Sequence, residues 1–287
     1  MGFFASVNGI VTPAHEARVS VLDNGFTFGD SVYETLRTYG GRPFALDRHL
    51  RRLRHSAERL GITAPPDVKL AAWLDTLLAA AANPESYIRF IVSRGVGDIS
   101  YRFERVQGPT VVMAVKPFEV PPAQHFEAGV AVIVSSVRRN APEALDPGIK
   151  SCNLLNNILA VREAQAKGAL EPIMLNQHGE VAEGASSNVF IVKRGVLRTP
   201  PLSAGILPGV TREILLELAP TLGIASEEVT VLPPDLRGAD EAFLTSTLKE
   251  AMPICIIDGQ PVGDGKPGPV TLRLLQAFRE YAPSQSR

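Results

Sequence analysis

The sequence predicts a globular chain of the mixed α/β class, built from two domains. Three observations lead to this prediction. Helical and strand-like hydrophobic patterns alternate along the chain, and its 287 residues are enough for two domains of ordinary size. Prolines at Pro117, Pro121 and Pro122 mark a candidate boundary. We therefore expect an N-terminal domain over residues 1–120 and a C-terminal domain over residues 121–287.

Composition excludes several classes of protein. Apolar residues make up 45% of the chain and the net charge is −1, which is typical of a soluble globular protein. No apolar run approaches the roughly 20 residues that cross a bilayer, and Met1–Ala5 is too short and uncharged for a signal peptide. No broad basic field points to nucleic acid. We expect a cytoplasmic protein that binds neither membrane nor nucleic acid.

The cysteines and histidines give no sign of a metal site. Two cysteines, Cys152 and Cys255, cannot form a disulfide scaffold, and the five histidines show no HExxH-like spacing. Metal catalysis is therefore not expected, and a reducing compartment is the expected location.

The first half opens with strand patterns. Asn8-Gly9 lies between two apolar runs, which predicts a two-residue hairpin. Residues 32–39 then alternate between two faces of a strand. One face carries Val32, Glu34, Leu36 and Thr38, and the other carries Tyr33, Thr35, Arg37 and Tyr39. The second, aromatic and polar face either lines a pocket or is the wet side of an antiparallel sheet, and periodicity does not separate these alternatives.

Two helices are expected next. Asp47 is a candidate N-cap, and apolar residues recur at helical spacing behind it until Gly61. Arginines surround this apolar stripe. Such arginines usually form a solvated face, but Arg52 adjoins the stripe and has the alternative of pointing inward. A second helix is expected over 67–83, where Pro84 closes it.

Strands surround the candidate domain boundary. Residues 87–94 read as a buried strand that contains Arg89, and a charge there must be paired or face a cavity. Residues 110–115 form another strand, and 129–137 a third, β-branched one.

A single lysine, Lys150, is presented by a turn. A Pro-Gly sequence, Pro147-Gly148, precedes Lys150, and a helical pattern over 154–167 follows it. A lysine held in this way can form an imine with a carbonyl compound. Taken alone, Lys150 is more simply explained as one of many solvated lysines.

Three further stretches carry groups of possible chemical use. Glu183 closes a strand and opens a turn of small residues. Leu207-Pro-Gly precedes an amphipathic helix, so free N–H groups at its positive end form an anion site, although an ordinary helix entry is the commoner reading. Hydroxyls at Thr245, Ser246 and Thr247 end another strand and either bind a phosphate or cap a turn. A final helix is expected over 268–281.

Together these groups match the requirements of pyridoxal 5'-phosphate. Its aldehyde takes a lysine amine, and its ring nitrogen needs a facing carboxylate. Its phosphate is bound by N–H groups, hydroxyls and an arginine.

The chain resembles the class IV aminotransferases, the pyridoxal-phosphate enzymes of fold type IV. The resemblance covers nearly the whole chain. Its motifs are Phe28-Gly-Asp-Ser-Val-Tyr-Glu34, His49-Leu-Arg-Arg52-Leu, Lys150, Glu183-Gly-Ala-Ser-Ser-Asn188-Val-Phe190, Leu197-Arg-Thr199 and Leu207-Pro-Gly-Val-Thr-Arg212. The family implies a small N-terminal α/β domain, a larger C-terminal pseudo-barrel domain that binds pyridoxal phosphate, and a homodimer.

The resemblance also implies a role for individual residues. Lys150 matches the lysine that forms the imine and carries the proton of the substrate Cα. The residues matching cofactor-binding positions are Glu183 for the ring nitrogen, Arg52, Val210, Thr211 and Thr247 for the phosphate, and Leu207 against the ring.

The positions expected to contact substrate do not all match the same branch of the family. Tyr87-x-Arg89 is similar to a strand of branched-chain aminotransferases, where the arginine helps to seat 2-oxoglutarate. The Arg-x-His pair of D-amino-acid enzymes is missing from the loop 97–102. Phe28 and Tyr33 depart from the branched-chain pattern. So do Thr35 and the turn Thr247-Leu248-Lys249, which replaces a small-residue turn that binds the substrate carboxylate through backbone N–H groups. We expect Leu248 and Lys249 to contact substrate, with Lys249 either adding a charge to the carboxylate pocket or pointing to solvent. The spacing after Lys150 is more like that of the D-amino-acid and lyase branches.

The resemblance thus implies transfer of an amino group from a branched-chain L-amino acid to 2-oxoglutarate. A D-amino-acid or (R)-amine transaminase is the alternative, and an aminodeoxychorismate lyase, against which Arg89 argues, is a weaker one. A non-catalytic binder of a cofactor or small molecule is also conceivable, but Lys150 and Glu183 argue against it.

Overall fold

The computed structural model describes residues 2–286, which form two compact units. Unit 1 contains the chain up to Glu119, the segment Ile149–Asn153 and the residues from Ala282 on. Unit 2 contains Val120–Gly148 and Leu154–Tyr281. The lysine segment therefore belongs to unit 1, although it follows the predicted boundary at residue 120.

Unit 1 is built on a six-stranded antiparallel sheet with the strand order β2-β1-β6-β5-β3-β4. Its strands are β1 (Phe4–Val7), β2 (Ile10–Pro13), β3 (Ser31–Tyr39), β4 (Arg42–Pro43), β5 (Ser86–Ser93) and β6 (Thr110–Pro117). The predicted hairpin is confirmed. Asn8 and Gly9 connect β1 to β2 with φ angles of 51° and 89°, which an Asn-Gly pair adopts readily.

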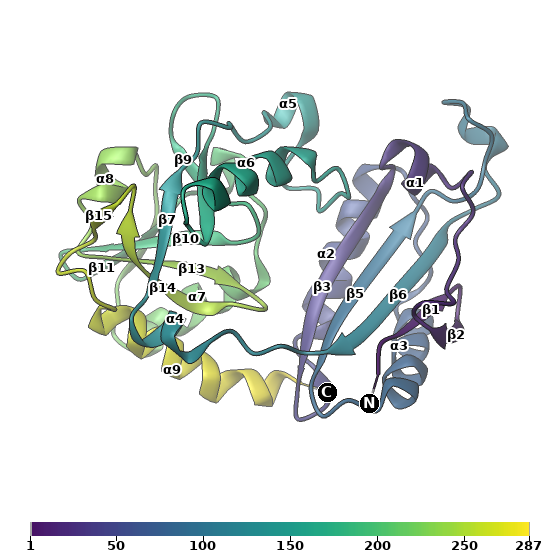
Figure 1. Cartoon of the computed structure of the whole chain (residues 1–287), viewed down its shortest axis with the longest axis horizontal. Coiled ribbons are helices and arrows are strands. Elements are labelled where there is room, and N and C mark those ends of the chain that lie inside the picture. Colours follow the sequence, from purple (N-terminus) through teal and green to yellow (C-terminus); the bar gives the residue numbers. More distant parts are fainter. Residues whose placement is uncertain (1, 287) are drawn as a thin grey trace. The chain divides into compact units, whose positions relative to one another are not determined.

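Two helices cover one face of this sheet (Figure 1). The helices of unit 1 are α1 (Asn24–Phe28), α2 (Leu46–Arg59) and α3 (Asp67–Ala81), with 3-10 turns η1 (Phe103–Arg105) and η3 (Ala282–Gln285). Helix α2 packs on β3, and α3 packs on β1 and β6. Leu53, Leu70 and Leu74 bury their side chains completely against the sheet, so the core lies between helices and strands.

The predicted alternation along β3 is reproduced. Its first face is almost inaccessible to solvent and carries Val32, Glu34, Leu36 and Thr38. Val32 and Leu36 belong to the core beneath α2. Tyr33 and Thr35 are only half-buried on the other face.

The predicted N-cap of α2 is wrong. Ala45, with a φ of 47°, occupies the N-cap position, and the helix begins at Leu46. Asp47 lies in the first turn, where its charge favours the helix dipole without capping an N–H group. The start is set by a distant segment, because the Ala45 amide donates to the carbonyl oxygen of Gln285.

Unit 2 contains a mixed sheet with the order β12-β11-β10-β13-β14-β7-β8-β9, and β15 pairs with β14. Its strands are β7 (Val130–Val134), β8 (Glu171–Leu175), β9 (Val181–Gly184), β10 (Asn188–Lys193), β11 (Val196–Thr199), β12 (Ser226–Glu228), β13 (Glu241–Ser246), β14 (Glu250–Ile257) and β15 (Gln260–Pro261). Strand β9, at one end of this order, also lies against β10. The sheet therefore curls back on itself, as a pseudo-barrel does.

Helices surround the curled sheet of unit 2 (Figure 1). They are α4 (Ala123–Glu127), α5 (Pro142–Leu145), α6 (Leu155–Ala166), α7 (Val210–Thr221), α8 (Pro233–Arg237) and α9 (Pro269–Tyr281), with the 3-10 turn η2 (Leu202–Ala204). Helix α6 packs on β8, and α9 on β13 and β14. Within residues 2–286, every helix is too short or too polar to cross a bilayer.

A buried ion-pair network joins α2 to β3 in unit 1. Arg52 donates from Nε to Glu34 Oε1 at 2.7 Å and from Nη2 to Oε2 at 2.8 Å. His49 Nδ1 lies 2.7 Å from Glu34 Oε2. Burial alone would raise the pKa of Glu34. Arg52 and His49 lower this pKa by more than burial raises it, so the net pKa lies well below the usual range. Burial lowers the pKa of His49, so this ring is neutral and donates its Nδ1 proton.

This network makes a stability prediction. In Glu34→Gln, the buried Arg52 charge loses its partner, and the free energy of unfolding at about pH 7 should fall by about 3–5 kcal/mol. The pKa of Glu34 is lower in the folded state than in the unfolded state. The ionised Glu34 therefore stabilises the fold fully above the unfolded-state pKa of 4.5, and this stabilisation is lost progressively as the pH falls from 4.5 towards the folded-state pKa. The deficit of the variant should therefore shrink by about 1 kcal/mol between about pH 7 and about pH 3.5.

Urea denaturation at both pH values measures this difference. Glu119→Gln is the matched control, because the Glu119 side chain is 86% exposed and its exchange should change stability by less than about 0.5 kcal/mol. A deficit of Glu34→Gln that stays constant with pH would contradict the assignment of a depressed pKa.

Candidate active site

The lysine segment is held as an additional short strand beside β3 in unit 1. Ser151 forms a bridge with Val32. The Tyr33 amide donates to the Lys150 carbonyl oxygen at 2.9 Å, and the Lys150 amide donates to Ser56 Oγ on α2 at 3.1 Å. Both backbone polar groups of Lys150 are thus engaged, so its Cα is fixed and its side chain alone remains to move.

Three predicted residues come together at this segment. Lys150 Nζ lies 4.6 Å from the centroid of the Tyr33 ring, and Arg89 Cζ lies 3.6 Å from the same centroid. Arg89 Nη1 also donates to Thr35 Oγ1 at 3.1 Å. Burial raises the pKa of Tyr33, so its hydroxyl stays protonated at neutral pH and can donate a hydrogen bond. Tyr33, Thr35 and Arg89 share the half-buried face of the sheet, which supports the pocket alternative for that face.

Arg89 retains hydrogen-bonding capacity. Its guanidinium stacks on the Tyr33 ring and donates to the Thr35 hydroxyl, and no carboxylate in the described part of unit 1 forms an ion pair with it. A guanidinium has five N–H donors, and its fork matches a carboxylate. Arg89 is therefore a candidate carboxylate-binding residue.

Arg52 and Phe28 complete the predicted residues of unit 1. Arg52 is oriented by two hydrogen bonds to Glu34, as described above. Phe28, at the end of α1, packs on Tyr101, with 5.2 Å between the ring centroids. The ion pair between Glu34 and Arg52 was not predicted. The one available signal was a carboxylate on the otherwise apolar face of a strand.

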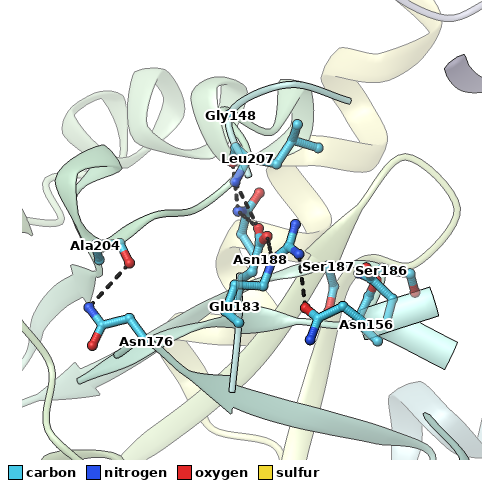
Figure 2. Close-up of polar contacts among 12 residues, drawn as sticks. Gly148, Asn156, Asn176, Glu183, Ser186, Ser187, Asn188, Ala204 and Leu207 are labelled. Carbon is cyan, nitrogen blue, oxygen red and sulfur yellow. Dashed lines mark hydrogen bonds and ion pairs between the residues drawn. The ribbon is translucent and has the colours of Figure 1, made fainter. Parts of the chain in front are cut away.

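Glu183 is the centre of a polar network in unit 2 (Figure 2). Its Oε2 accepts from the Leu207 amide at 2.9 Å and from Asn188 Nδ2 at 3.2 Å. Asn188 Nδ2 also donates to the Leu207 carbonyl oxygen at 2.9 Å. The structure thus brings Glu183 and Leu207 together, with Asn188 bridging them.

Arg139 is a second residue that the sequence did not reveal. Its Nε donates to Glu183 Oε1 at 2.9 Å, and its Nη1 donates to Asn156 Oδ1 at 3.2 Å. The guanidinium supplies positive charge beside a carboxylate that is only 4% exposed. Arg139 lies in the loop after β7, where no periodicity distinguishes it from its neighbour Arg138.

The start of α7 has the properties of an anion site. Gly209 occupies the N-cap position without a side-chain cap, which leaves the first-turn N–H groups of Val210 and Thr211 outside the helical ladder. Among residues 2–286, none is a hydrogen-bond partner of the buried Thr211 Oγ1. A side chain at position 209 would collide with Asn188 Oδ1, so only glycine fits there. A phosphate would satisfy these donors.

The turn between β13 and β14 contains the remaining predicted residues. Thr247 is buried, and Leu248 is half-buried. Lys249 forms an ion pair with Glu171, and its Nζ donates to Ser186 Oγ at 2.6 Å.

Taken unit by unit, these residues fit pyridoxal phosphate. Unit 1 offers an amine beside an aromatic ring and an oriented arginine, and unit 2 offers a buried carboxylate and an uncapped helix start with an orphaned hydroxyl. These are the donor and acceptor types that an aldehyde, a phosphate and a ring nitrogen require.

Comparison with known sequences identifies close relatives of two kinds. The family described as amino-transferase class IV matches residues 31–257. A Methanocaldococcus jannaschii protein named "Putative branched-chain-amino-acid aminotransferase" is 38% identical over 276 residues, which is 96% of this chain and 94% of that protein. D-alanine aminotransferase of Staphylococcus aureus (strain MSSA476) is 36% identical, with 98% of both chains covered.

Solved structures agree with these relatives. The branched-chain amino acid aminotransferase of Escherichia coli superimposes with a TM-score of 0.91 at 32% identity, covering 99% of this chain and 96% of that one. The branched-chain amino acid aminotransferase of Thermobaculum terrenum, in its PLP-form, superimposes with a TM-score of 0.87 at 29% identity, covering 99% and 94%. This chain belongs to the class IV aminotransferases, the fold type IV enzymes that use pyridoxal 5'-phosphate.

Proposed function

We propose that this aminotransferase transfers the amino group of a branched-chain L-amino acid to 2-oxoglutarate. When bound, pyridoxal phosphate supplies the aldehyde that accepts the amino group and the ring that withdraws electrons from the substrate Cα. The amine of Lys150 attaches the cofactor covalently and moves the proton of the substrate Cα. Its fixed backbone keeps the reach of the side chain constant during both roles.

The remaining predicted residues hold the cofactor in this proposal. The Glu183 carboxylate accepts a hydrogen bond from the ring nitrogen, and Arg139 and Asn188 orient that carboxylate. Leu207 packs on the ring, while Glu34 orients Arg52 towards the phosphate. The phosphate-binding groups are the Arg52 guanidinium, the N–H groups of Val210 and Thr211, and the hydroxyls of Thr211 and Thr247.

One observation carries the choice of substrate. Arg89 stacks on Tyr33, is oriented by Thr35, and has no carboxylate partner in the described part of unit 1. It therefore suits the second carboxylate of 2-oxoglutarate or glutamate. Phe28 and Tyr33 offer aromatic surface for a branched apolar side chain.

Transamination of D-amino acids is the second candidate. The similarity to D-alanine aminotransferase favours it, and Tyr33 stands where branched-chain enzymes tend to have phenylalanine. The absence of an Arg-x-His pair from residues 97–102 argues against it. The spacing after Lys150 favours the lyase branch as much as the D-amino-acid branch, whereas Arg89 argues against the lyase, and no separate observation favours an (R)-amine transaminase.

Half-reactions of the purified holoenzyme separate these candidates. L-leucine should convert the cofactor and remove its visible absorbance, and 2-oxoglutarate should then restore the absorbance. D-alanine should leave the spectrum unchanged. Conversion by D-alanine alone would reverse the assignment, and pyruvate released without an amino acceptor would indicate the lyase.

Arg89→Met tests the seat for the dicarboxylate in the same assay. Loss of a charge-assisted hydrogen bond should raise KM for 2-oxoglutarate by about 10- to 100-fold. The rate of the L-leucine half-reaction should change much less. A uniform loss with both substrates would show that Arg89 has no selective role.

Lys150→Ala tests the catalytic assignment. The variant should lose the visible absorbance of the bound cofactor and the covalent adduct that borohydride fixes on residue 150. Its kcat should fall by at least about 10³-fold, as expected when a residue that acts covalently is removed. Lys167→Ala, at a lysine whose side chain is 55% exposed, should retain both signals. Turnover by Lys150→Ala close to that of the wild type would refute the site.

We also propose that the enzyme is a cytoplasmic homodimer. Leu155, Ile158 and Leu159 are exposed on α6 at the i, i+3 and i+4 positions of one helical stripe. Exposed apolar stripes of this kind are typical of protein interfaces. Both cysteines are free, which suits a reducing compartment.

Analytical ultracentrifugation should give the mass of two chains for the wild type and of one chain for Ile158→Arg; a monomeric wild type would contradict the dimer.

A further inference from the structure

A buried carboxylate, Glu171, contacts two turns of unit 2. Glu171, at the start of β8, is only 2% exposed. Its Oε1 accepts from the Ser186 amide at 2.7 Å, from Ser187 Oγ at 2.9 Å and from Ser186 Oγ at 3.2 Å. Glu171 therefore fixes the turn of residues 184–187, which directly follows Glu183 and connects β9 to β10.

The same carboxylate is bound by a lysine from a second turn. Lys249 Nζ forms an ion pair with Glu171 Oε2 and donates to Ser186 Oγ. The Lys249 amide also donates to Ser246 Oγ at 3.1 Å, which closes the turn of residues 246–249 between β13 and β14. Glu171 thus ties the 246–249 turn to the 184–187 turn.

The position of the ammonium argues against a direct role of Lys249 in binding substrate. Two of its three N–H donors are directed at Glu171 and Ser186. Burial alone would raise the pKa of Glu171. The charge of Lys249 and the hydrogen bonds from Lys249, Ser186 and Ser187 lower it by more than that, so the net pKa is below the usual range. A substrate that drew Lys249 away would leave a buried charge without its cation, which is costly.

We propose that the Lys249–Glu171 pair is a positioning device for the 246–249 turn, and that through this turn it sets the affinity for the amino donor. The inference rests on the proposed function, in which Thr247 contributes a hydroxyl to the phosphate site, and on the expectation from the sequence that Leu248 contacts substrate. It replaces the expectation that Lys249 itself binds the substrate. Lys249 acts through Glu171, and the residues that touch the donor belong to the backbone and side chains of the turn.

Three variants in the full-length holoenzyme test this inference, namely Lys249→Met, Glu171→Gln and the double variant. KM and kcat are measured with the amino donor that the wild type uses fastest, and the affinity for pyridoxal phosphate is measured separately by titration. Each single variant should raise KM for the donor by about 10- to 100-fold, because a shift of the turn of about 1 Å misplaces the bound donor. Cofactor affinity should fall less than donor affinity, because Thr247 supplies only one of the proposed contacts to the cofactor and the Lys150 and Glu183 sites are retained.

The double variant is expected to show a KM no worse than either single variant, because it removes both charges and leaves none unpaired. It also serves as the informative protein if a single variant fails to fold. Lys249→Arg keeps the charge and should stay closest to the wild type. Lys167→Met removes an exposed lysine paired with Glu163 and should leave KM unchanged.

Three outcomes would overturn the inference. A raised KM in Lys249→Met with an unchanged KM in Glu171→Gln would show that Lys249 contacts the donor directly. Unchanged KM in both variants would show that the pair has no role in binding. Equal losses of donor and cofactor affinity would show that the Lys249–Glu171 pair contributes only to the general stability of the fold. A wild type that binds the cofactor without transaminating any donor would instead refute the proposed function.

Discussion

The backbone pairing of the lysine segment with β3 is the interaction on which the position of the Lys150 side chain in unit 1 depends. Lys150 is separated from Tyr33 by more than a hundred residues, yet the two share a hydrogen bond at 2.9 Å. A second hydrogen bond, from the Lys150 amide to Ser56, attaches the segment to α2. Each such bond contributes only about 0.5–1.5 kcal/mol, but together they fix the Cα from which the amine proposed to form the imine extends.

Buried carboxylates with cationic partners recur in both units. Glu34 is bound by Arg52 and Glu183 by Arg139, and a third carboxylate pairs with a lysine in unit 2. A buried ion pair adds little net stability, because desolvation offsets most of the attraction. Its geometric effect is larger, since bidentate or multiply hydrogen-bonded groups have few alternative orientations. Such pairs therefore suit a site whose groups must be pre-oriented for a cofactor.

Most helices and strands could be predicted because their signals are local. The Asn8-Gly9 hairpin, the alternation along β3 and the two helices α2 and α3 before Pro84 follow from turn chemistry and periodicity. The start of α2 could not be predicted, because Ala45 is held by the carbonyl group of Gln285. No short-range pattern records a contact over such a separation.

The order of residues was enough to establish the types of chemical group and, through the motifs, the family and its cofactor. Lys150 and Glu183 could be proposed as site residues in this way, because both lie in short segments with a recognisable pattern. Only the tertiary structure decided which charged side chains form ion pairs. Arg139 pairs with Glu183, and Arg52 pairs with Glu34. Lys249 pairs with the Glu171 carboxylate and not with solvent or substrate. These pairings escape prediction because the energy of a charge depends on its burial and on partners that folding brings from distant parts of the chain.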